Sequence, residues 1–453
     1  MVAAILAGAA LLGWPALLNG YPILFSDTGA FLAQMELRAF VWDKPYVYGP
    51  FMFLFHGHFS LWGPLLAVLL GLSHLLWLVQ RGVRGVATAR WHIALCAGLA
   101  GLTSAPWVAS LLMPDIFAPA VILCLYLLAF ATLSRWETVW LTALATLGVA
   151  VHLSHLPLAA ALVGLTVLLT WRMGPVLRAG LPLVLALALA LGLNWVGHGR
   201  LAISPFGGVF ALARLVADGP AARVIEAECP AAGWHMCRWA GRLPIDSDEF
   251  LWEPDGPVWA ERLDGAQPGG PISLAPEAGA IVSRTLRAYP AEVARLALGN
   301  AWRQLFLTRI GDVLGREEMG EALRERVQSV FGAAEAARLE AGLQWQDRLR
   351  GWATALTWQH PWVIVPAALG TLLVWWQAHQ AGDLARLRLG LFVLVGLTAN
   401  AVATGALSKP HHRYQARVIW LLPLAAALCW RPPRPGVMVA DRRRAPAGQA
   451  ELA

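Results

Sequence analysis

The chain has 453 residues, of which 58% are hydrophobic and only 14% are charged, and its mean hydropathy is +0.56. Soluble domains carry about 25% charged residues, so this composition argues against a soluble protein and indicates that much of the chain lies in lipid. The net charge of +7 does not indicate a nucleic-acid partner, because the basic residues gather in short loops between apolar runs, as the positive-inside rule describes.

Ten apolar stretches of roughly 15–20 residues predict an all-α fold, a polytopic bundle of about ten transmembrane helices. The first stretch lacks a basic segment and a clear cleavage site, so we interpret it as a retained helix rather than a signal peptide. Two weaker stretches, notably the last, could be re-entrant. In chain order the ten are Val2–Leu18, Leu61–Val79, Trp91–Ser110, Pro114–Leu133, Thr138–Val151, Leu156–Trp171, Leu181–Val196, Trp362–Trp376, Leu389–Thr404 and Val418–Trp430.

The charges of the connecting loops predict the topology. With ten helices, one side receives both termini and the arginine-rich loops, and that side should be cytoplasmic. These arginines are Arg81, Arg84, Arg90, Arg135, Arg172, Arg178, Arg386 and Arg388, with more in the tail. The expected domains are an N-terminal bundle (1–198), a large extracytoplasmic loop or lid with amphipathic helices (199–361), C-terminal transmembrane helices (362–430) and a disordered cytoplasmic tail (431–453).

Two acidic residues follow predicted helix ends on the exported side. Asp27, in Ser26-Asp-Thr-Gly, can act as a general base or metal ligand in a cleft, or can cap a short interfacial helix. Asp115 follows Pro114, where it suits the positive end of a helix, and it could equally be a second carboxylate beside Asp27. Both interpretations stay open for each residue.

The first exported segment also contains cations and aromatic residues. Arg38 and Lys44 could bind a phosphate group or could anchor the segment at lipid headgroups, and Tyr48 belongs to the aromatic stretch that follows them. In a later turn, His152 and His155 would be neighbours on a helix. This spacing suits a metal pair, but two histidines alone make an incomplete metal site.

The last exported segment reads Lys409-Pro-His411-His412-Arg413-Tyr414-Gln-Ala-Arg417. Arg413 and Arg417 are four residues apart, so they share a helix face and can bind phosphate oxygens together. The alternative is a headgroup anchor. However, this cluster lies on the side that the positive-inside rule disfavours, and charge placed against that trend indicates function.

The polar loop contains Cys229 and Cys237, which could form a disulfide if the loop is exported. The other three cysteines lie in apolar runs, where we expect them to be packing residues.

At these residues the sequence resembles the GT-C superfamily of integral membrane glycosyltransferases. Asp27 matches the acidic residue of that superfamily's first extracytoplasmic loop, Asp115 matches a second acid that opens a later helix, and His411–Arg417 is similar to a basic motif before a late helix. The long loop is similar to that of a group of bacterial membrane proteins whose function is not established. The similar stretches are Asp218-Gly-Pro, Cys229-Pro, Cys237-Arg and Asp248-Glu-Phe-Leu-Trp.

The resemblance implies an enzyme of the bacterial cell envelope, in the inner membrane, with its large loop in the periplasm. It would move a hexosyl or pentosyl group from a polyprenyl-phosphate donor to a glycan, lipid or protein acceptor. Asp27 and Asp115 would be catalytic. The donor phosphate would bind Arg413, Arg417, Lys44 and Arg38, and the substrates would contact His411, His412, Tyr414, His152, His155 and Tyr48. The first loop lacks an Asp-x-Asp or Asp-Glu pair, so a divalent metal stays an open alternative that no motif supports, and no metal ligands are predicted.

Two other functions remain open from the sequence. A transporter or flippase for a lipid or glycolipid would need polar residues at mid-membrane and usually repeated halves, and few of the former and none of the latter are evident. A non-enzymatic membrane scaffold would leave the His411–Arg417 cluster unexplained.

Overall fold

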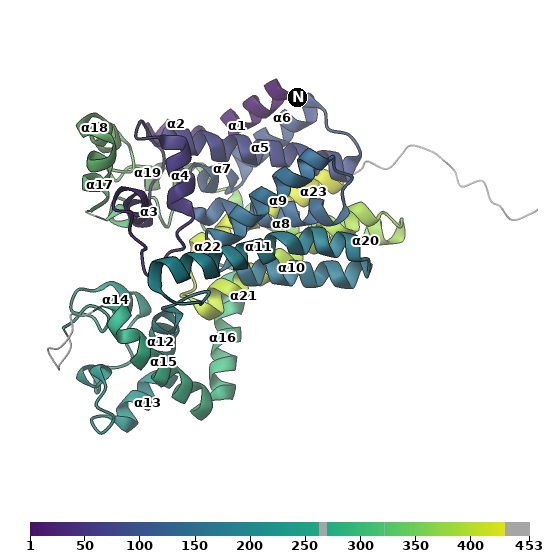
Figure 1. Ribbon diagram of the computed structural model, residues 1–453. Coiled ribbons are helices and arrows are strands. Elements are labelled where there is room, and N and C mark those ends of the chain that lie inside the picture. Colours follow the sequence, from purple (N-terminus) through teal and green to yellow (C-terminus); the bar gives the residue numbers. More distant parts are fainter. Residues whose placement is uncertain (262–269, 321, 431–453) are drawn as a thin grey trace, which may run out of the picture.

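The structure is a computed structural model that describes residues 1–261, 270–320 and 322–430 (Figure 1). Over these residues the chain is helical, apart from one isolated parallel β-bridge between Ile23 and Leu111. All ten predicted apolar stretches coincide with helices, so the all-α helical bundle is confirmed. Four helices are long and apolar enough to cross a membrane, so ten crossings stay a prediction. They are α5 (Trp62–Arg84), α11 (Met173–His198), α20 (His360–Gln380) and α21 (Leu384–Leu407).

Four of the predicted single helices are divided in two. In each case a proline lies within the first three residues of the second α-helix. Proline is tolerated there because the first N–H groups of a helix have no helical acceptor, whereas inside a helix it removes a hydrogen bond and kinks or breaks the helix. The pairs are α1 (Val2–Leu12) and α2 (Trp14–Asn19), α6 (Ala89–Leu102) and α7 (Ala105–Ser110), the short 3-10 helix η1 (Pro114–Ile116) and α8 (Phe117–Phe130), and α22 (His412–Ile419) and α23 (Leu421–Cys429).

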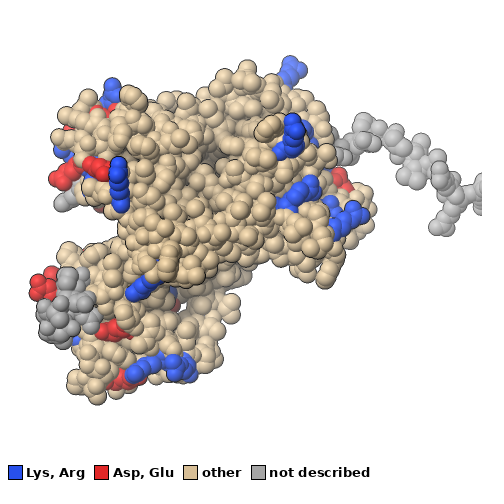
Figure 2. Space-filling view, viewed as in Figure 1, with Lys and Arg blue, Asp and Glu red and all other residues tan. Residues whose placement is uncertain are grey.

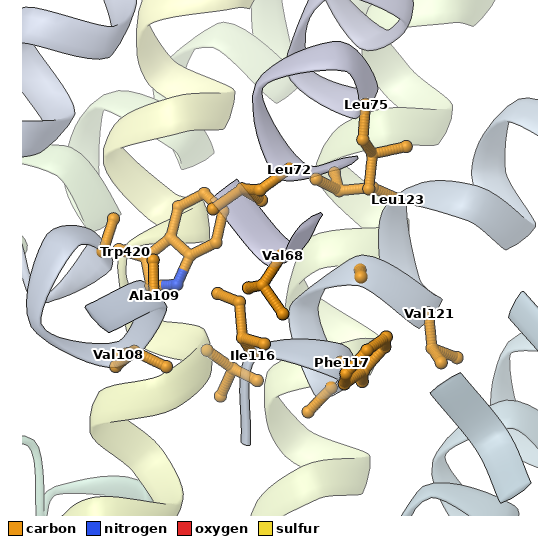
Figure 3. Close-up of a cluster of buried hydrophobic side chains, with 14 of the residues drawn as sticks. Val68, Leu72, Leu75, Val108, Ala109, Ile116, Phe117, Val121, Leu123 and Trp420 are labelled. Atoms are coloured by element: carbon orange, nitrogen blue, oxygen red, sulfur yellow. The ribbon is translucent and has the colours of Figure 1, made fainter. Parts of the chain in front are cut away.

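Helix α8 lies at the centre of the bundle, and every residue from Phe117 to Ala129 is buried. It contacts α5, α11, α21, α9 (Arg135–Ala150) and α10 (His155–Thr170). Figure 3 shows Val68 and Leu72 of α5 beside Ile116 and Phe117 at the start of this core. Small residues allow the close approach: a Cβ on Gly148 of α9 would lie 2.8 Å from Val121. Close packing of this kind is what holds helices together in lipid.

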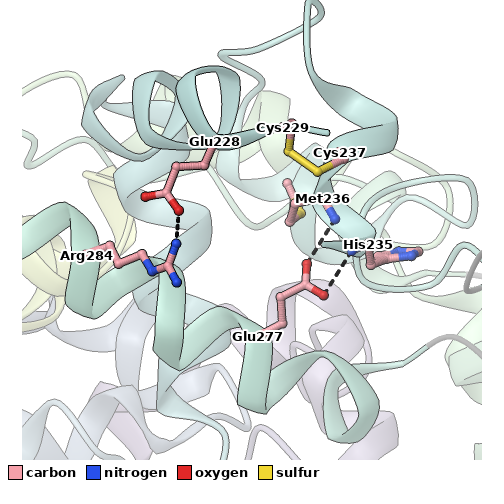
Figure 4. Close-up of a disulfide and its surroundings, with 7 residues drawn as sticks. All are labelled: Glu228, Cys229, His235, Met236, Cys237, Glu277 and Arg284. Carbon is pink, nitrogen blue, oxygen red and sulfur yellow. Dashed lines mark hydrogen bonds and ion pairs between the residues drawn. A yellow bond between two sulfur atoms is a disulfide. The ribbon is translucent and has the colours of Figure 1, made fainter. Parts of the chain in front are cut away.

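The first part of the predicted long loop folds around a hydrophobic core of its own. We call it the cap lobe (207–288); it contains α12 (Gly207–Ala217), α13 (Pro220–Glu228), α14 (Ser247–Trp252) and α15 (Pro271–Ala288). Cys229 and Cys237 form a disulfide in this lobe. Beside the disulfide, the Glu277 carboxylate accepts the backbone N–H groups of His235 and Met236 (Figure 4).

The rest of the long loop returns to the bundle. Helix α16 (Pro290–Leu305) runs along α21, where a Cβ on Gly405 would lie 2.7 Å from the Asn300 carbonyl oxygen. Buried residues of 313–353 then join the main core. This second group, which we call the side lobe, contains α17 (Ala322–Phe331), α18 (Ala333–Ala341) and α19 (Leu349–Leu356), and α17 packs on α3 (Ser26–Glu36). The described residues of the predicted long loop therefore form two lobes, joined by α16, at one end of the bundle (Figure 1).

The arginine-rich loops meet at the other end of the bundle. Arg84 donates to the Trp430 carbonyl oxygen, Arg386 to that of Cys429 and Arg178 to that of Ala129. On the face in Figure 2, charged side chains gather at this end and at the two lobes, with a largely uncharged band between them. The predicted disordered tail, 431–453, lies outside the described residues.

Candidate functional site

Four segments that are far apart in the sequence meet between the bundle and the lobes. They are the start of α3, the short helix η1, the turn between α9 and α10, and the start of α22. Each predicted polar site on the exported face except Arg38 belongs to one of these segments or to a segment packed against them. The site is therefore made of helix ends rather than of helix middles.

Asp115 is the central acid of this site. Its side chain is only 3% exposed, and Oδ1 lies 3.4 Å from Arg417 Nη1 and 3.7 Å from Arg413 Nε. Pro114 and the η1 turn place the carboxylate at the entrance of α8, facing the first two turns of α22. Asp115 is therefore the acid that lies against the basic motif.

Arg417 is fully engaged by protein groups. It donates to Asn400 Oδ1 at 2.8 Å from Nη2 and at 3.1 Å from Nε, and to Ser154 Oγ at 2.9 Å. Asn400 lies inside the long apolar helix α21, where an amide needs such a partner. These contacts fix α22 against α21 and hold Arg417 beside Asp115.

Arg413 is less completely satisfied. Its guanidinium carbon lies 4.5 Å from the ring centre of Phe25 and 5.1 Å from that of Tyr414. The Nε and Nη1 atoms are buried and have no hydrogen-bond partner among the described residues. Arg413 lines a small open pocket, whose empty space is about 410 Å³ when the solvent at its mouth is counted, and whose wall also includes Asp115, Arg417 and part of the segment 309–314. We call it the arginine pocket.

Asp27 belongs to a second charged group beside the first. It lies in the first turn of α3, whose cap is the hydrogen bond from Phe25 N–H to Thr28 Oγ1 at 3.1 Å. Its Oδ1 lies 3.1 Å from Lys44 Nζ, and Lys44 also pairs with Asp43. Burial lowers the pKa of Lys44, but the two carboxylates outweigh it and raise the pKa overall. Asp27 and Asp43 already neutralise the charge of Lys44, so Lys44 would attract a phosphate group only weakly.

The predicted aromatic and histidine residues surround these two groups. Burial, reinforced by Arg417, Arg413 and Lys44, lowers the pKa of His152 well below its ordinary value. Its neutral Nδ1 lies 2.8 Å from Ser154 Oγ, and its ring centre lies 5.1 Å from that of His155. His155 contacts the Gly148 carbonyl oxygen through Nδ1 at 2.6 Å.

Tyr48 is fully buried, and burial together with the nearby charge of Asp115 raises its pKa. Its hydroxyl oxygen has no hydrogen-bond partner among the described residues. It therefore stands protonated beside the carboxylate, as a further donor at the edge of the site.

The two histidines of the basic motif hold the start of α22. His411 is its N-cap. Its Nδ1 lies 3.3 Å from Arg413 N–H, which it accepts when this nitrogen is unprotonated, and 3.3 Å from Asp312 Oδ2, to which it donates when protonated. His412 Nδ1 accepts the N–H of Arg309 at 3.0 Å. Burial lowers the pKa of both rings. Arg38 is exposed at the far end of α3 from Asp27, so it is not part of this arrangement.

Sequence reasoning missed Asp43, Ser154, Asn400 and Asp312, which all contact the predicted residues. Asn400 left a usable signal, because it is an amide inside an apolar stretch. Asp312 left none, since the long polar segment around it contains many acids. No cluster of three or more His, Cys, Asp or Glu side chains with the arrangement of a metal site occurs in 1–261, 270–320 and 322–430.

Comparisons of the chain with known protein families, with curated proteins and with solved structures find no match.

Proposed function

We propose that the protein is a membrane glycosyltransferase that moves a sugar from a polyprenyl-phosphate carrier to an acceptor, and that the arginine pocket binds the carrier's phosphate. The observation that carries this proposal is Arg413. Two guanidinium groups face a single buried carboxylate; Arg413 Nε lies 3.7 Å from it, beyond hydrogen-bond distance, and Nε and Nη1 are buried without a hydrogen-bond partner among the described residues. Buried polar groups are nearly always hydrogen-bonded, so a bound anion would supply the partner that these two donors lack.

The two arginines differ in how many of their donors bind protein groups, and this difference supports a phosphate ligand. Arg417 donates hydrogen bonds to Asn400, Ser154 and Asp115, so its role is structural. Arg413 lies against the rings of Phe25 and Tyr414, and its Nε and Nη1 atoms have no hydrogen-bond partner among the described residues. A planar guanidinium of this kind binds phosphate oxygens two at a time and can stabilise the charge on a leaving phosphate.

An apolar groove next to the arginine pocket supports a lipid carrier. It holds about 810 Å³ of space, counting its open mouth, and lies between α4 (Tyr48–His56), α5, α8 and α9. Its inner wall includes Ile116 and Phe117, which directly follow Asp115 in the chain (Figure 3). Its mouth includes Leu54 and Phe55, which are 75% and 44% exposed. A carrier with its chain in the groove would bring its phosphate to the arginine pocket.

The distribution of charge and the disulfide support an inner-membrane orientation. The arginine-rich loops meet at one end of the bundle, which would face the cytoplasm under the positive-inside rule. The Cys229–Cys237 disulfide lies in the cap lobe at the other end, and disulfides persist in oxidising compartments such as the periplasm. The site would then face the periplasm, in agreement with transfer from a lipid carrier there.

The test is transfer by the full chain in lipid nanodiscs. The donors are undecaprenyl-phosphoryl hexoses and pentoses labelled in the sugar, and a detergent-solubilised cell-envelope fraction supplies the acceptor. We expect release of undecaprenyl phosphate with at least one donor, and a loss of about 100-fold or more for Arg413→Gln. Arg287→Gln, at an exposed position of α15, is the matched control. Movement of intact donor across vesicle membranes, with no bond broken, would contradict transfer and favour a flippase.

A further inference from the structure

A second acid lies in the arginine pocket, on the wall opposite the membrane bundle. Asp312 belongs to the segment 309–314, which lines the pocket together with Asp115, Arg413 and Arg417. It comes from the long loop between the two lobes, whereas Asp115 comes from the entrance of α8. The pocket therefore presents one carboxylate from each side.

The segment that carries Asp312 is anchored at several points. Gln304, at the end of α16, both accepts His411 N–H at 2.7 Å and donates to the His411 carbonyl oxygen at 2.8 Å. Arg309 N–H binds His412 Nδ1, and Gln344 donates to the Val313 carbonyl oxygen at 3.3 Å. The bonds of Gln304 and Arg309 tie this segment to the start of α22, and the bond of Gln344 ties Val313 to the side lobe. The position of Asp312 relative to Arg413 is thus fixed by hydrogen bonds, unlike that of an acid in a free surface loop.

The three acids of the site differ in their exposure and in the charged groups that pair with them. Asp115 is 3% exposed and faces two guanidinium groups, and Asp27 forms an ion pair with Lys44 and does not line the arginine pocket. Asp312 is 28% exposed, and it faces the His411 ring at 3.3 Å. Of these carboxylates, Asp312 is the one that both opens into the pocket and has no cation held against it among the described residues.

We propose that Asp312 is the general base of the transfer reaction and that His411 is its positioning residue, an inference that rests on the proposed glycosyltransferase function. The acceptor hydroxyl would lie between Asp312 and the sugar. As its oxygen forms the new bond to the anomeric carbon, its proton passes to a carboxylate oxygen of Asp312. The bond from the anomeric carbon to the phosphate oxygen breaks, and its electron pair leaves with the polyprenyl phosphate, beside Arg413.

Several charged groups act on this site. His411, His412 and Glu318 interact with Asp312, Arg413 and Asp248 also act on His411, and Arg309 and Arg303 act on His412. The imidazole of His411 touches both Asp312 and the backbone N–H of Arg413, so one side chain fixes the base relative to the phosphate-binding arginine. This contact would keep the base that accepts the acceptor's proton aligned with the arginine that binds the leaving phosphate.

The experiment measures turnover and carrier binding separately in the full chain in nanodiscs, using the labelled donors and envelope fraction above. We expect Asp312→Asn to lower kcat by at least about 100-fold, as removal of a general base does. Binding of undecaprenyl phosphate should not change, which also shows that the variant is folded. Asp312→Glu should recover part of the rate. Asp255→Asn, at an exposed position of the cap lobe, should leave the rate unchanged.

His411→Asn keeps a side chain that can cap α22 but removes the ring that faces Asp312. We expect it to lower kcat more than it changes KM, and to shift the acidic limb of the pH–rate profile. Full turnover by Asp312→Asn would overturn the inference, as would a loss confined to Asp27→Asn; either would leave the proposed function intact. Absence of both transfer and undecaprenyl phosphate binding in the unmodified chain would instead overturn the proposed function, and this inference with it.

Discussion

At the scale of single residues, the site contains two charged groups, and in each of them the positive and negative charges are unequal in number. Around Lys44 there are two carboxylates for one ammonium group, and around Asp115 there are two guanidinium groups for one carboxylate. The acidic group and the basic group stand side by side, since Asp27 also acts on Arg413. This arrangement leaves the excess positive charge in the arginine pocket.

The pairing of Lys44 predicts a large stability effect. Lys44→Met would leave Asp27 and the buried Asp43 without their cation, and breaking a buried ion pair from one side costs about 3 kcal/mol or more. We expect a lower free energy of unfolding in detergent titrations. Asp43→Asn/Lys44→Met should recover part of the loss, because the double variant buries one charge fewer. Equal stability of all three proteins would show that Lys44 is an ordinary surface cation.

The sequence predicted the residues of this site better than it predicted their partners. Asp115, Arg413 and Arg417 are distinctive because charges at helix ends stand out against apolar stretches. Their distances depend on how α8, α21 and α22 pack, which local sequence does not determine. Asp312 could not be found for this reason: only the fold carries it from the long polar segment to the pocket.

At the scale of elements, the cap lobe is joined to the site by a small number of contacts. Lys409, just after α21, pairs with Asp246 and Asp248 at the start of α14, at 2.8 and 2.7 Å. The last residue of α14, Trp252, has its ring centre 5.8 Å from Lys44 Nζ. Helix α14 therefore lies between the base of α22 and the Lys44 group. Lys409 holds its start, and its buried side chains Phe250 and Leu251 pack in the core of the cap lobe.

The Lys409 pairs predict how the cap lobe responds to pH. Burial raises the pKa of Asp246, but the hydrogen bond and charge of Lys409 outweigh burial and lower it overall. Burial lowers the pKa of Lys409, but Asp246 and Asp248 outweigh burial and raise it overall. Stability from the lowered acid is present above its unfolded pKa of about 3.9 and is lost as pH falls through the folded value. Stability from the raised lysine is present below about pH 10.4 and is lost as pH rises through its folded value.

Hydrogen exchange in α14 measures this effect. At pH 7, Lys409→Gln should speed exchange modestly, by an amount equivalent to no more than about 1 kcal/mol, because these side chains are partly exposed. In strongly acidic buffer the variant and the unmodified chain should exchange alike. A difference between them that persisted at low pH would mean that Lys409 acts by packing rather than by charge.

The sequence predicted where helices occur but not where they break. Apolar runs identify all ten stretches, whereas the division into α1 and α2, or α6 and α7, depends on prolines whose effect is decided by packing. The long loop was predicted as one lid. Its division into a cap lobe and a side lobe follows from two separate sets of buried residues, which no simple periodicity reveals.

At the scale of the whole molecule, the bundle has two chemically different ends. One end collects the arginine-rich loops, and the other bears the two lobes and the mixed acid and base site (Figure 2). The walls of the two spaces include consecutive residues, Asp115 in the arginine pocket and Ile116 and Phe117 in the apolar groove. This geometry suits a ligand with a long apolar chain and an anionic head better than it suits either a soluble anion or a neutral lipid.

Binding of undecaprenyl phosphate and of undecaprenol, compared in nanodiscs of phosphatidylcholine, tests this central claim most directly. We expect the full chain to bind the phosphate clearly more tightly than the alcohol, and Arg413→Gln to raise the Kd for the phosphate about 10-fold or more while leaving the alcohol unaffected. Equal affinity for the two lipids, or an unchanged Kd in Arg413→Gln, would contradict the assignment of the arginine pocket as a phosphate site.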